Sequence, residues 1–512
     1  MKASTLLWGV ILPAVFTSCH KSETPSRTAP HPENPQRVVP KGTINAFINS
    51  ELQKNGIFKW EKANDSIAWS ALVQGDSILS VGYQPAGFTD LDKKIHTIDV
   101  NSGEWATAKA QVLALVMENE KRGNTPVAIK DILTVDANKL PVINIRASQY
   151  ATLQALRASK LVRYAEPIGY GAFMEETSGA NTRTNSSILT FGCGDNVANP
   201  SLVNGVDYTN ITPGAKQSWN FTYHKIPQAW VKSTGRNVKV MLIDTGVSPD
   251  QDDMGNSFNQ GASSGRTIQK LVTFPGSTPA DSCGHGTKMA GVLAAPRGVN
   301  GNAAGIAYNA NLVTVHAAEN VIILSTGSVQ GVSAAYVLGG DDPDVKIISM
   351  SMGTIYAFSQ ITDAINYAYN KQKLMFCAAG TSFGIITPFL GVIFPAILPQ
   401  VQAVTGIKDN LTQACVDCHT GAEVAFTIVM EKTSTAINPL TLAMTGDAPS
   451  TVGGSSVATA SASAIAALVW SKHPSDTREN IVERLRAASS FANNRNSQFG
   501  WGVIDADQAV GQ

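Results

Sequence analysis

From residue 226 onward, the chain carries short, continuous apolar runs separated by longer segments with helical spacing. The runs cover residues 238–243, 312–315, 345–349, 374–378 and 401–404. Strands that are apolar along their whole length are typical of a parallel sheet covered on both faces. The pattern therefore predicts an α/β fold with a mostly parallel sheet and helices on both faces. Ligands of such sheets bind beyond the carboxyl ends of the strands.

A different pattern precedes this region, between residues 59 and 170. Residues 104–121 place Ala, Val, Leu and Met on one side of a predicted amphipathic helix. Residues 139–146 alternate like a strand, residues 150–159 are helical, and residues 161–167 are extended again. The order of these elements predicts a small α+β domain in front of the parallel sheet.

The first residues predict export. Residues 6–16 form an apolar stretch after Lys2 that is too short to span a bilayer and is typical of a signal peptide. The sequence Phe-Thr-Ser-Cys that ends at Cys19 resembles a bacterial lipobox, in which the cysteine is lipidated after cleavage. A plainly cleaved secretory signal is the alternative. Both interpretations of residues 1–19 predict an exported protein, either secreted or a lipoprotein anchored to the bacterial cell envelope.

Two polar segments separate the predicted units. Residues 20–58 predict a proline-rich tether, with Pro25, Pro30, Pro32, Pro35 and Pro40. Residues 171–225 are rich in Gly, Ser, Asn and Thr and predict a connector that is open to cleavage. The small α+β domain then covers residues 59–170, and the parallel sheet belongs to a domain of residues 226–512.

Composition limits the classes of partner. The chain has 512 residues, 43% of them apolar, so it can bury a large core in more than one domain. Its 39 Lys and Arg balance its 39 Asp and Glu, and no block of like charge occurs. Neither nucleic acid nor an anionic membrane surface is therefore an expected partner.

Three short motifs carry the candidate chemistry. Asp244 ends the first apolar run, His285 lies in Gly-His-Gly-Thr, and Ser455 and Ser456 follow two glycines at the start of a small-residue helix. A serine hydroxyl becomes a nucleophile when an imidazole takes its proton, and the imidazole needs a carboxylate to fix its tautomer. The chain order Asp, His, Ser is that of the subtilisin-type triad.

Together these motifs resemble the subtilases, a family of serine endopeptidases with a subtilisin-like fold. The resemblance implies that Asp244 orients and stabilises His285, that His285 is the general base, and that Ser456 is the nucleophile. Ser456 keeps the register of the family's Gly-Thr-Ser-x-Ala helix, whereas Ser455 would shift it by one. Ser455 is also compatible with a role as a helix N-cap.

The resemblance extends to the small domain, because its strand, helix and strand end in Arg-Tyr-Ala-Glu-Pro, as an inhibitory subtilase propeptide does. It implies a propeptide over residues 59–170 and a maturation site within residues 171–225. A small α+β domain of unrelated purpose is the alternative.

The substrate-binding and oxyanion residues follow from the same resemblance. Subtilases carry Ala-Ala-Gly-Asn, whose Asn amide donates to the oxyanion, and this chain has Ala-Ala-Gly-Thr with Thr381 in that place. Ser351, Met352 and Gly353 resemble the substrate-binding strand, whose main chain would pair with an extended peptide, and Gly454 is expected beside the substrate.

Two further positions depart from the family pattern. Lys288 stands where a second His is common, which we interpret as a change at the rim of the site, and Ala460 replaces the usual Pro.

Six cysteines in an exported chain favour disulfides. Cys415 and Cys418 predict a local disulfide, although with the following histidine they also fit a haem-attachment motif or a metal site. Cys377 lies in an apolar run and is expected to be a buried free thiol. With Cys19 lipidated, Cys193 and Cys283 are left over and can pair. No cofactor is predicted, and structural calcium stays open.

The sequence therefore predicts an exported serine endopeptidase that is made as a self-inhibited precursor and acts on protein or peptide substrates. A surface-anchored binding protein with a subtilase fold and lost catalysis is the alternative from another class. A haem-bearing electron carrier is a third, more distant one.

Overall fold

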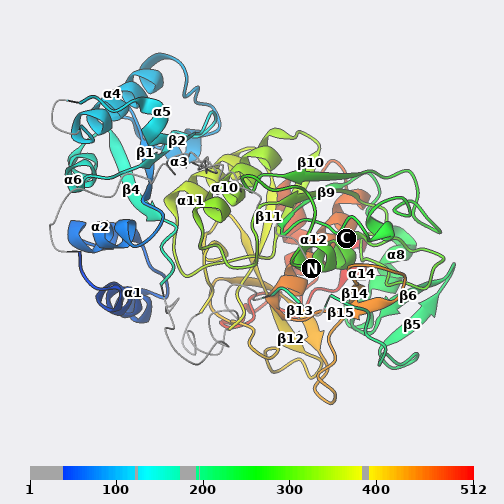
Figure 1. Cartoon of the computed structure of the whole chain (residues 1–512). Coiled ribbons are helices and arrows are strands. Elements are labelled where there is room, and N and C mark those ends of the chain that lie inside the picture. The colour runs from blue at the N-terminus through cyan, green and yellow to red at the C-terminus, as the bar shows by residue number, and fades with distance from the viewer. Residues whose placement is uncertain (1–37, 122–124, 173–191, 195, 383–390) are drawn as a thin grey trace, which may run out of the picture.

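The computed structural model describes residues 38–121, 125–172, 192–194, 196–382 and 391–512. An N-terminal module (residues 38–172) lies beside a larger main domain that starts at residue 192 (Figure 1). No helix in the described ranges is long and apolar enough to cross a membrane. The predicted signal peptide and Cys19 lie outside the described residues.

The main domain is built on a seven-stranded sheet in which every adjacent pair is parallel. Its order is β13 (Val424–Glu431), β12 (Gln402–Lys408), β11 (Leu374–Ala378), β10 (Val345–Met350), β7 (Lys239–Asp244), β9 (Asn311–His316) and β8 (Ile268–Val272). The five predicted apolar runs all contribute strands to this sheet, and β7, which ends in Asp244, lies inside it between β10 and β9.

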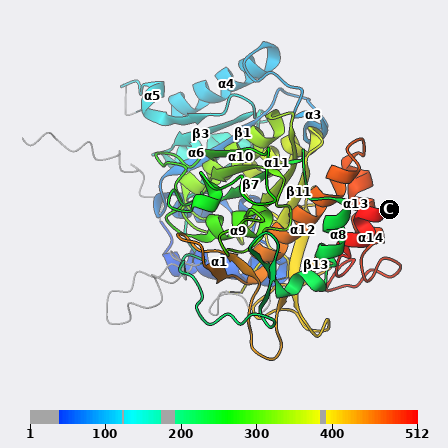
Figure 2. The same cartoon turned by 90° about the vertical axis from the view of Figure 1, so that its right-hand side faces the viewer.

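Helices cover both faces of this sheet, which explains why its strands are apolar along their length. Met241 and Ile243 of β7 pack in one core with α10 (Thr326–Asp341) and α11 (Ser359–Asn370). The alternate residues of the same strand pack in a second core with α9 (His285–Ala294) and α12 (Gly454–Lys472). Figure 2 shows α12 on the side of the sheet where α8 and α13 also lie. The predicted α/β fold is confirmed.

Smaller elements complete the main domain. They are α8 (Ile226–Lys232), α13 (Arg478–Ala487), α14 (Ala506–Gly511), the pair β5 (Tyr208–Ile211) and β6 (Ala215–Ser218), and the pair β14 (Leu440–Leu442) and β15 (Pro449–Thr451).

The N-terminal module is an antiparallel four-stranded sheet with helices. The strand order is β2 (Leu133–Asp136), β3 (Val142–Arg146), β1 (Ile78–Tyr83) and β4 (Val162–Ile168). The helices are α1 (Lys41–Asn55), α2 (Asp65–Val73), α3 (Leu91–Lys94), α4 (Gly103–Asn119), α5 (Ile129–Ile132) and α6 (Tyr150–Ala158). The predicted helices appear as α4 and α6, and the predicted strands as β3 and β4.

Two sequence predictions need correction here. The tether predicted for residues 20–58 contains helix α1, because Ile44, Ile48 and Leu52 recur every four residues and are buried along one face. Phe58 is also packed, and its main chain pairs with Ile355 and Ala357 of the main domain. Of the prolines that suggested a tether, Pro40 is the one within the described residues, and the others precede residue 38. The connector predicted for residues 171–225 contains strands β5 and β6, which belong to the main domain. The sequence patterns also missed strands β1, β2, β8 and β13.

Candidate active site

The predicted Asp and His meet at the carboxyl edge of the parallel sheet. Asp244 is the last residue of β7 and His285 is the first residue of α9, and both are buried. His285 Nδ1 lies 2.7 Å from Asp244 Oδ1, which also accepts from the main-chain N–H of Thr245 at 2.8 Å. Because a carboxylate can only accept, Nδ1 carries the proton and Nε2 is left free to take one. This is the tautomer that a general base requires.

Glycines allow α9 to approach the strand this closely. Gly284, with φ of 90°, starts the helix in the left-handed region. A side chain at Gly286 would collide with the carbonyl oxygen of Gly246, two residues beyond Asp244. The glycines on both sides of His285 therefore serve the close contact between helix and strand.

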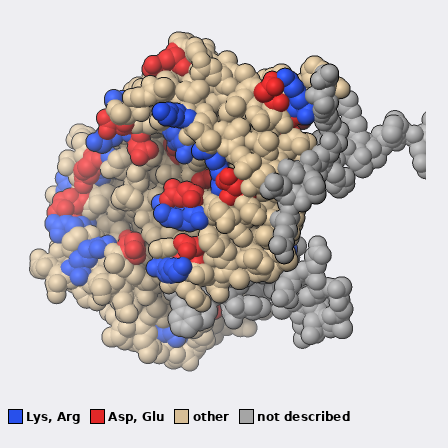
Figure 3. Space-filling model, turned by 90° about the vertical axis from the view of Figure 1, so that its left-hand side faces the viewer, with Lys and Arg blue, Asp and Glu red and all other residues tan. Residues whose placement is uncertain are grey.

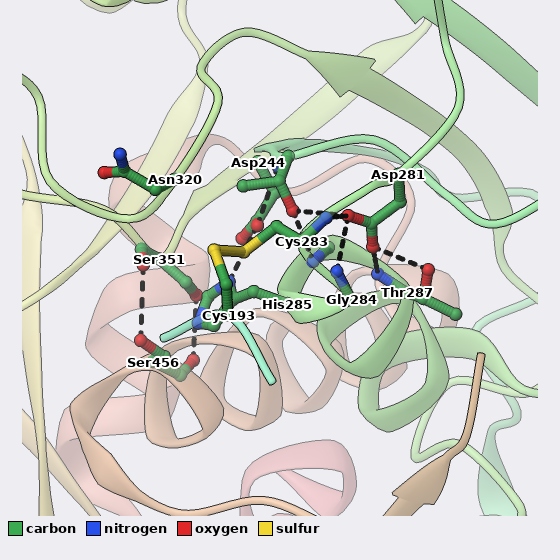
Figure 4. A network of polar contacts seen from close by, with 12 residues as sticks. Cys193, Asp244, Asp281, Cys283, Gly284, His285, Thr287, Asn320, Ser351 and Ser456 are labelled. Atoms are coloured by element: carbon green, nitrogen blue, oxygen red, sulfur yellow. Dashed lines mark hydrogen bonds and ion pairs between the residues drawn. A yellow bond between two sulfur atoms is a disulfide. The ribbon is translucent and has the colours of Figure 1, made fainter. Parts of the chain in front are cut away.

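Ser456 lies in the first turn of α12 and faces the same cavity as His285. The cavity has a volume of about 400 Å³, and its lining includes Gly454 and Thr381. Figure 4 shows the His285 ring between Asp244 and Ser456. The Ser456 hydroxyl donates to the carbonyl of Ser351 at 3.2 Å, so it must turn from that oxygen to meet the imidazole.

The expected substrate strand follows β10, but part of its main chain is already paired. Gly353 N–H donates to Val321 O at 3.1 Å, and Ile323 N–H donates to Gly353 O at 3.0 Å. Met352 is buried, and the Ser351 hydroxyl donates to Ser456 O at 2.8 Å. An extended peptide can therefore pair at Gly353 only if it displaces residues 321–323, a constraint that the sequence did not indicate.

Asp281 is a site residue that the sequence analysis missed. Its Oδ1 accepts from Thr245 Oγ1, Cys283 N and Gly284 N at 2.9, 3.0 and 2.7 Å. Its Oδ2 accepts from the N–H and hydroxyl of Thr287 at 2.8 and 2.7 Å (Figure 4). A single buried carboxylate thus joins the residue after Asp244 to the start of α9. An acidic residue just before a helix was the available signal.

The predicted local disulfide is present, and so is the pairing that the sequence left open. Cys193 and Cys283 form a disulfide with a Cα–Cα distance of 4.4 Å, and Cys415 is paired with Cys418. The expected free thiol, Cys377, is buried, and burial raises its pKa to about 12. Within the described ranges, no group of three or more His, Cys, Asp and Glu side chains could hold a metal ion.

The disulfide to Cys283 fixes a segment beside His285. We call the described residues 192–194 and 196–200 the strap. Gly194 N–H and the Asn196 side-chain amide donate to Cys283 O at 3.3 and 3.0 Å. Lys288 Nζ donates to Gly194 O at 3.2 Å, so the lysine that departs from the family pattern helps to hold the strap.

A carboxylate bonded to an imidazole, with a serine hydroxyl in the same cavity, is the arrangement used by serine hydrolases. The sequence model of the Subtilase family, Peptidase_S8, matches residues 235–502, which is more than half of the chain. The chain therefore belongs to the subtilase family.

Curated relatives of the chain are proteases. The minor extracellular protease Epr of Bacillus subtilis is 29% identical over 324 residues, which are 62% of this chain and 44% of Epr. The thermostable alkaline protease of Halalkalibacterium halodurans is 29% identical over 59% of this chain and 75% of its own. The chain thus spans less than half the length of Epr. The crystal structure of MycP1 from Mycobacterium smegmatis matches 62% of this chain and 88% of its own at 20% identity, with a TM-score of 0.48.

The five bonds to Asp281 lead to a stability prediction. Asp281→Asn places an NH2 group against N–H and O–H donors, and we expect it to lower the free energy of unfolding by about 2–4 kcal/mol. Urea unfolding of the purified chain measures this loss. Asp252→Asn, at an exposed aspartate, is the matched control. Equal midpoints for the two variants would contradict the structural role of Asp281.

Proposed function

We propose that this chain is an exported serine endopeptidase that hydrolyses peptide bonds through Asp244, His285 and Ser456 and is made as a self-inhibited precursor. The observation that carries the proposal is the cavity that His285 and Ser456 share, together with the hydrogen bond between Asp244 and Nδ1 of the same imidazole. Membership of the subtilase family and the protease relatives support it. The name of Epr, an extracellular protease, supports export.

Each of the three residues has one task in this reaction. Ser456 Oγ attacks the substrate carbonyl as His285 Nε2 takes its proton, and the carbonyl electrons move to the oxygen. The tetrahedral intermediate expels the amine, which receives the proton from His285, and an ester with Ser456 remains. Water, activated by His285, then hydrolyses the ester. Asp244 stabilises the imidazolium that exists between these transfers.

Thr381 is the proposed side-chain donor to the oxyanion, together with the main-chain N–H of Ser456. It faces the same cavity, and its hydroxyl replaces the amide that other subtilases use. This departure also favours the alternative of a surface-anchored binding protein with lost catalysis, since a hydroxyl reaches less far than an amide. The rate of peptide hydrolysis distinguishes an endopeptidase from such a binding protein.

The first test of the proposal is the nucleophile. Ser456→Ala should lower the rate of peptide hydrolysis by about 10⁴- to 10⁶-fold, because the covalent step is lost. Ser463→Ala, at a fully buried serine of the same helix that does not line the cavity, is the control and should stay within about 2-fold of the parent. Hydrolysis of a fluorogenic peptide measures both. An active Ser456→Ala variant would refute the proposed mechanism.

The N-terminal module is the proposed inhibitory propeptide. Its strand β4 docks on α11: Arg163 pairs with Asp363 at 2.6 Å, and Tyr164 OH donates to the same carboxylate at 2.9 Å. Glu166 accepts from the N–H and hydroxyl of Ser359, the first residue of α11, at 3.0 and 2.6 Å.

Side chains of both charges line the boundary between the module and α11. They surround a cavity of about 710 Å³ that includes Arg163, Glu166 and Asp363. On the side of the molecule where the N-terminal module lies, Figure 3 shows positive and negative groups interspersed. Deeper in the boundary, Gln360 Oε1 accepts from Ser80 Oγ and Asn144 Nδ2, both at 2.8 Å. These polar and ionic contacts lie beside an apolar one, in which Phe58 and Trp60 of the module pack against Tyr356 of the main domain.

The path of the chain supports cleavage in the connector. After β4, Ala172 N–H donates to Tyr356 OH at 3.0 Å. Tyr356 follows Gly353, in the expected substrate strand, by three residues. The described chain resumes at Gly192, which lines the cavity with His285 and Ser456. The proposed cleavage falls between these two points, on residues outside those that the structure describes. Removal of the signal peptide and lipidation of Cys19 are proposed for the same precursor.

This arrangement predicts two fragments that separate without reduction. A cut between Ala172 and Gly192 leaves Cys193 and Cys283 in the same fragment. The active chain should therefore run as two bands on a gel without reductant, and Ser456→Ala as one uncut band. Fragments that separate only after reduction would place the cut beyond Cys193. A mature N-terminus before residue 150 or after residue 238 would also contradict the arrangement.

Docking of the module should depend on pH through Glu166. Burial raises the pKa of this carboxyl from its ordinary value of 4.5 to about 7, despite the bonds from Ser359. The docked state therefore binds the proton more tightly. Its stabilising contribution is complete below about pH 4.5 and is lost as the pH rises through about 7.

Urea unfolding of the uncut Ser456→Ala chain measures this effect. Between pH 5 and pH 8, we expect it to lose about 1–3 kcal/mol relative to the same chain carrying Glu166→Gln, which cannot titrate. Glu61→Gln, at an exposed carboxyl beside the same cavity, is the control. Parallel pH profiles with and without Glu166 would contradict the prediction.

A further inference from the structure

Ser455, the serine beside the proposed nucleophile, contacts Thr381 twice. The two hydroxyl oxygens are 3.1 Å apart, and the main-chain N–H of Ser455 donates to Thr381 Oγ1 at 3.4 Å. Ser455 Oγ also accepts from the N–H of Gly380 at 3.2 Å. Ser455 is 1% exposed, whereas Thr381 faces the cavity. A buried hydroxyl thus lies directly behind the proposed oxyanion donor.

The available donors and acceptors determine which of the two hydroxyls donates to the other. Among the described residues, Thr381 Oγ1 is the acceptor that the structure offers to the buried proton of Ser455. If Thr381 donated instead, that proton would have no acceptor, and an unsatisfied buried donor is costly. Ser455 therefore donates its hydroxyl proton to Thr381, whose oxygen accepts from both the hydroxyl and the N–H of Ser455.

The hydroxyl proton of Thr381 is then not used in the bond with Ser455. With two incoming bonds on its oxygen, the hydroxyl directs its own proton away from Ser455 and toward the cavity. Gly454 keeps this side open, because a Cβ there would lie 3.1 Å from Thr381 Oγ1. The N–H of Gly380 polarises the Ser455 hydroxyl, and that hydroxyl in turn polarises Thr381.

We propose that Ser455 is a positioning residue that orients the Thr381 hydroxyl as a donor to the substrate oxyanion. The proposal rests on the function proposed above and extends it, because it explains how a threonine serves where other subtilases use an amide. An amide N–H has a fixed direction, whereas a hydroxyl rotates and needs a neighbour to set its proton. A preoriented donor stabilises the transition state without reorganisation during the reaction.

Kinetics of single and double variants on one peptide substrate test this role. Thr381→Val removes the donor and should lower kcat by about 100-fold. Ser455→Ala leaves the Thr381 hydroxyl in place but no longer fixes its direction, so this variant should lower kcat by roughly 10-fold. KM should stay within about 2-fold in both variants, because the interaction forms in the transition state. Ser455→Thr keeps the directing hydroxyl and should restore kcat.

The double variant separates a positioning role from a structural one. In the Thr381→Val background no hydroxyl remains to be oriented, so adding Ser455→Ala should lower kcat no further. An equal additional loss in that background would show that Ser455 acts through Gly380 or the fold, and would overturn the proposal. An unchanged kcat in Ser455→Ala alone would also overturn it.

The function proposed above fails in a different way. If Thr381→Val hydrolyses the peptide as fast as the parent while Ser456→Ala is inactive, then Thr381 is not the oxyanion donor and Ser455 has nothing to orient. If Ser456→Ala also remains active, the endopeptidase proposal itself is wrong. Thermal unfolding of each variant shows that the compared chains are folded.

Discussion

The hydrogen bond between Asp244 and His285 depends on a strand end and a helix start that meet inside the molecule. The two residues are 41 positions apart in the chain, and their side chains are almost fully buried. An ionised carboxylate in such a place is costly unless it is hydrogen-bonded. Asp244 receives bonds from His285 and Thr245, and the neighbouring Asp281 holds both Thr245 and the first turn of α9. The chemistry proposed at Ser456 relies on this arrangement.

Much of this architecture follows from sequence alone, because parallel strands covered on both faces must be apolar throughout. The same logic fails where burial is partial: β8 has exposed positions and gave no continuous run. Strand β13 is buried throughout, so its apolar run was a usable signal that the sequence analysis did not use. Proline content placed the boundary of the tether too far along the chain, although the spacing of Ile44, Ile48 and Leu52 already indicated helix α1. Composition is averaged over a segment, whereas helix formation depends on the face that the segment buries.

The residues of the candidate site also fall into two groups, those that the sequence identifies and those that only the structure identifies. Asp244, His285 and Ser456 lie in short motifs that are weak signals singly and are recognised together by their order in the chain. The task of Asp281 is to accept bonds from residues on two separate elements, so it is visible only once those elements are placed. The pairing of Gly353 with residues 321–323 and the bonds between Ser455 and Thr381 likewise depend on tertiary contacts. Positions that depart from the family pattern, Lys288 and Thr381, gain a physical explanation from their neighbours.

The central claim is that Ser456 is the nucleophile activated by His285. The most direct measurement is to react the matured protein with a fluorophosphonate probe, which labels activated serines, and to identify the modified residue by mass spectrometry. We expect one label per chain, on Ser456, and no label in a folded His285→Ala variant. A label on Ser455 or on any other residue, or a folded wild-type chain that hydrolyses peptides but does not react, would contradict this account.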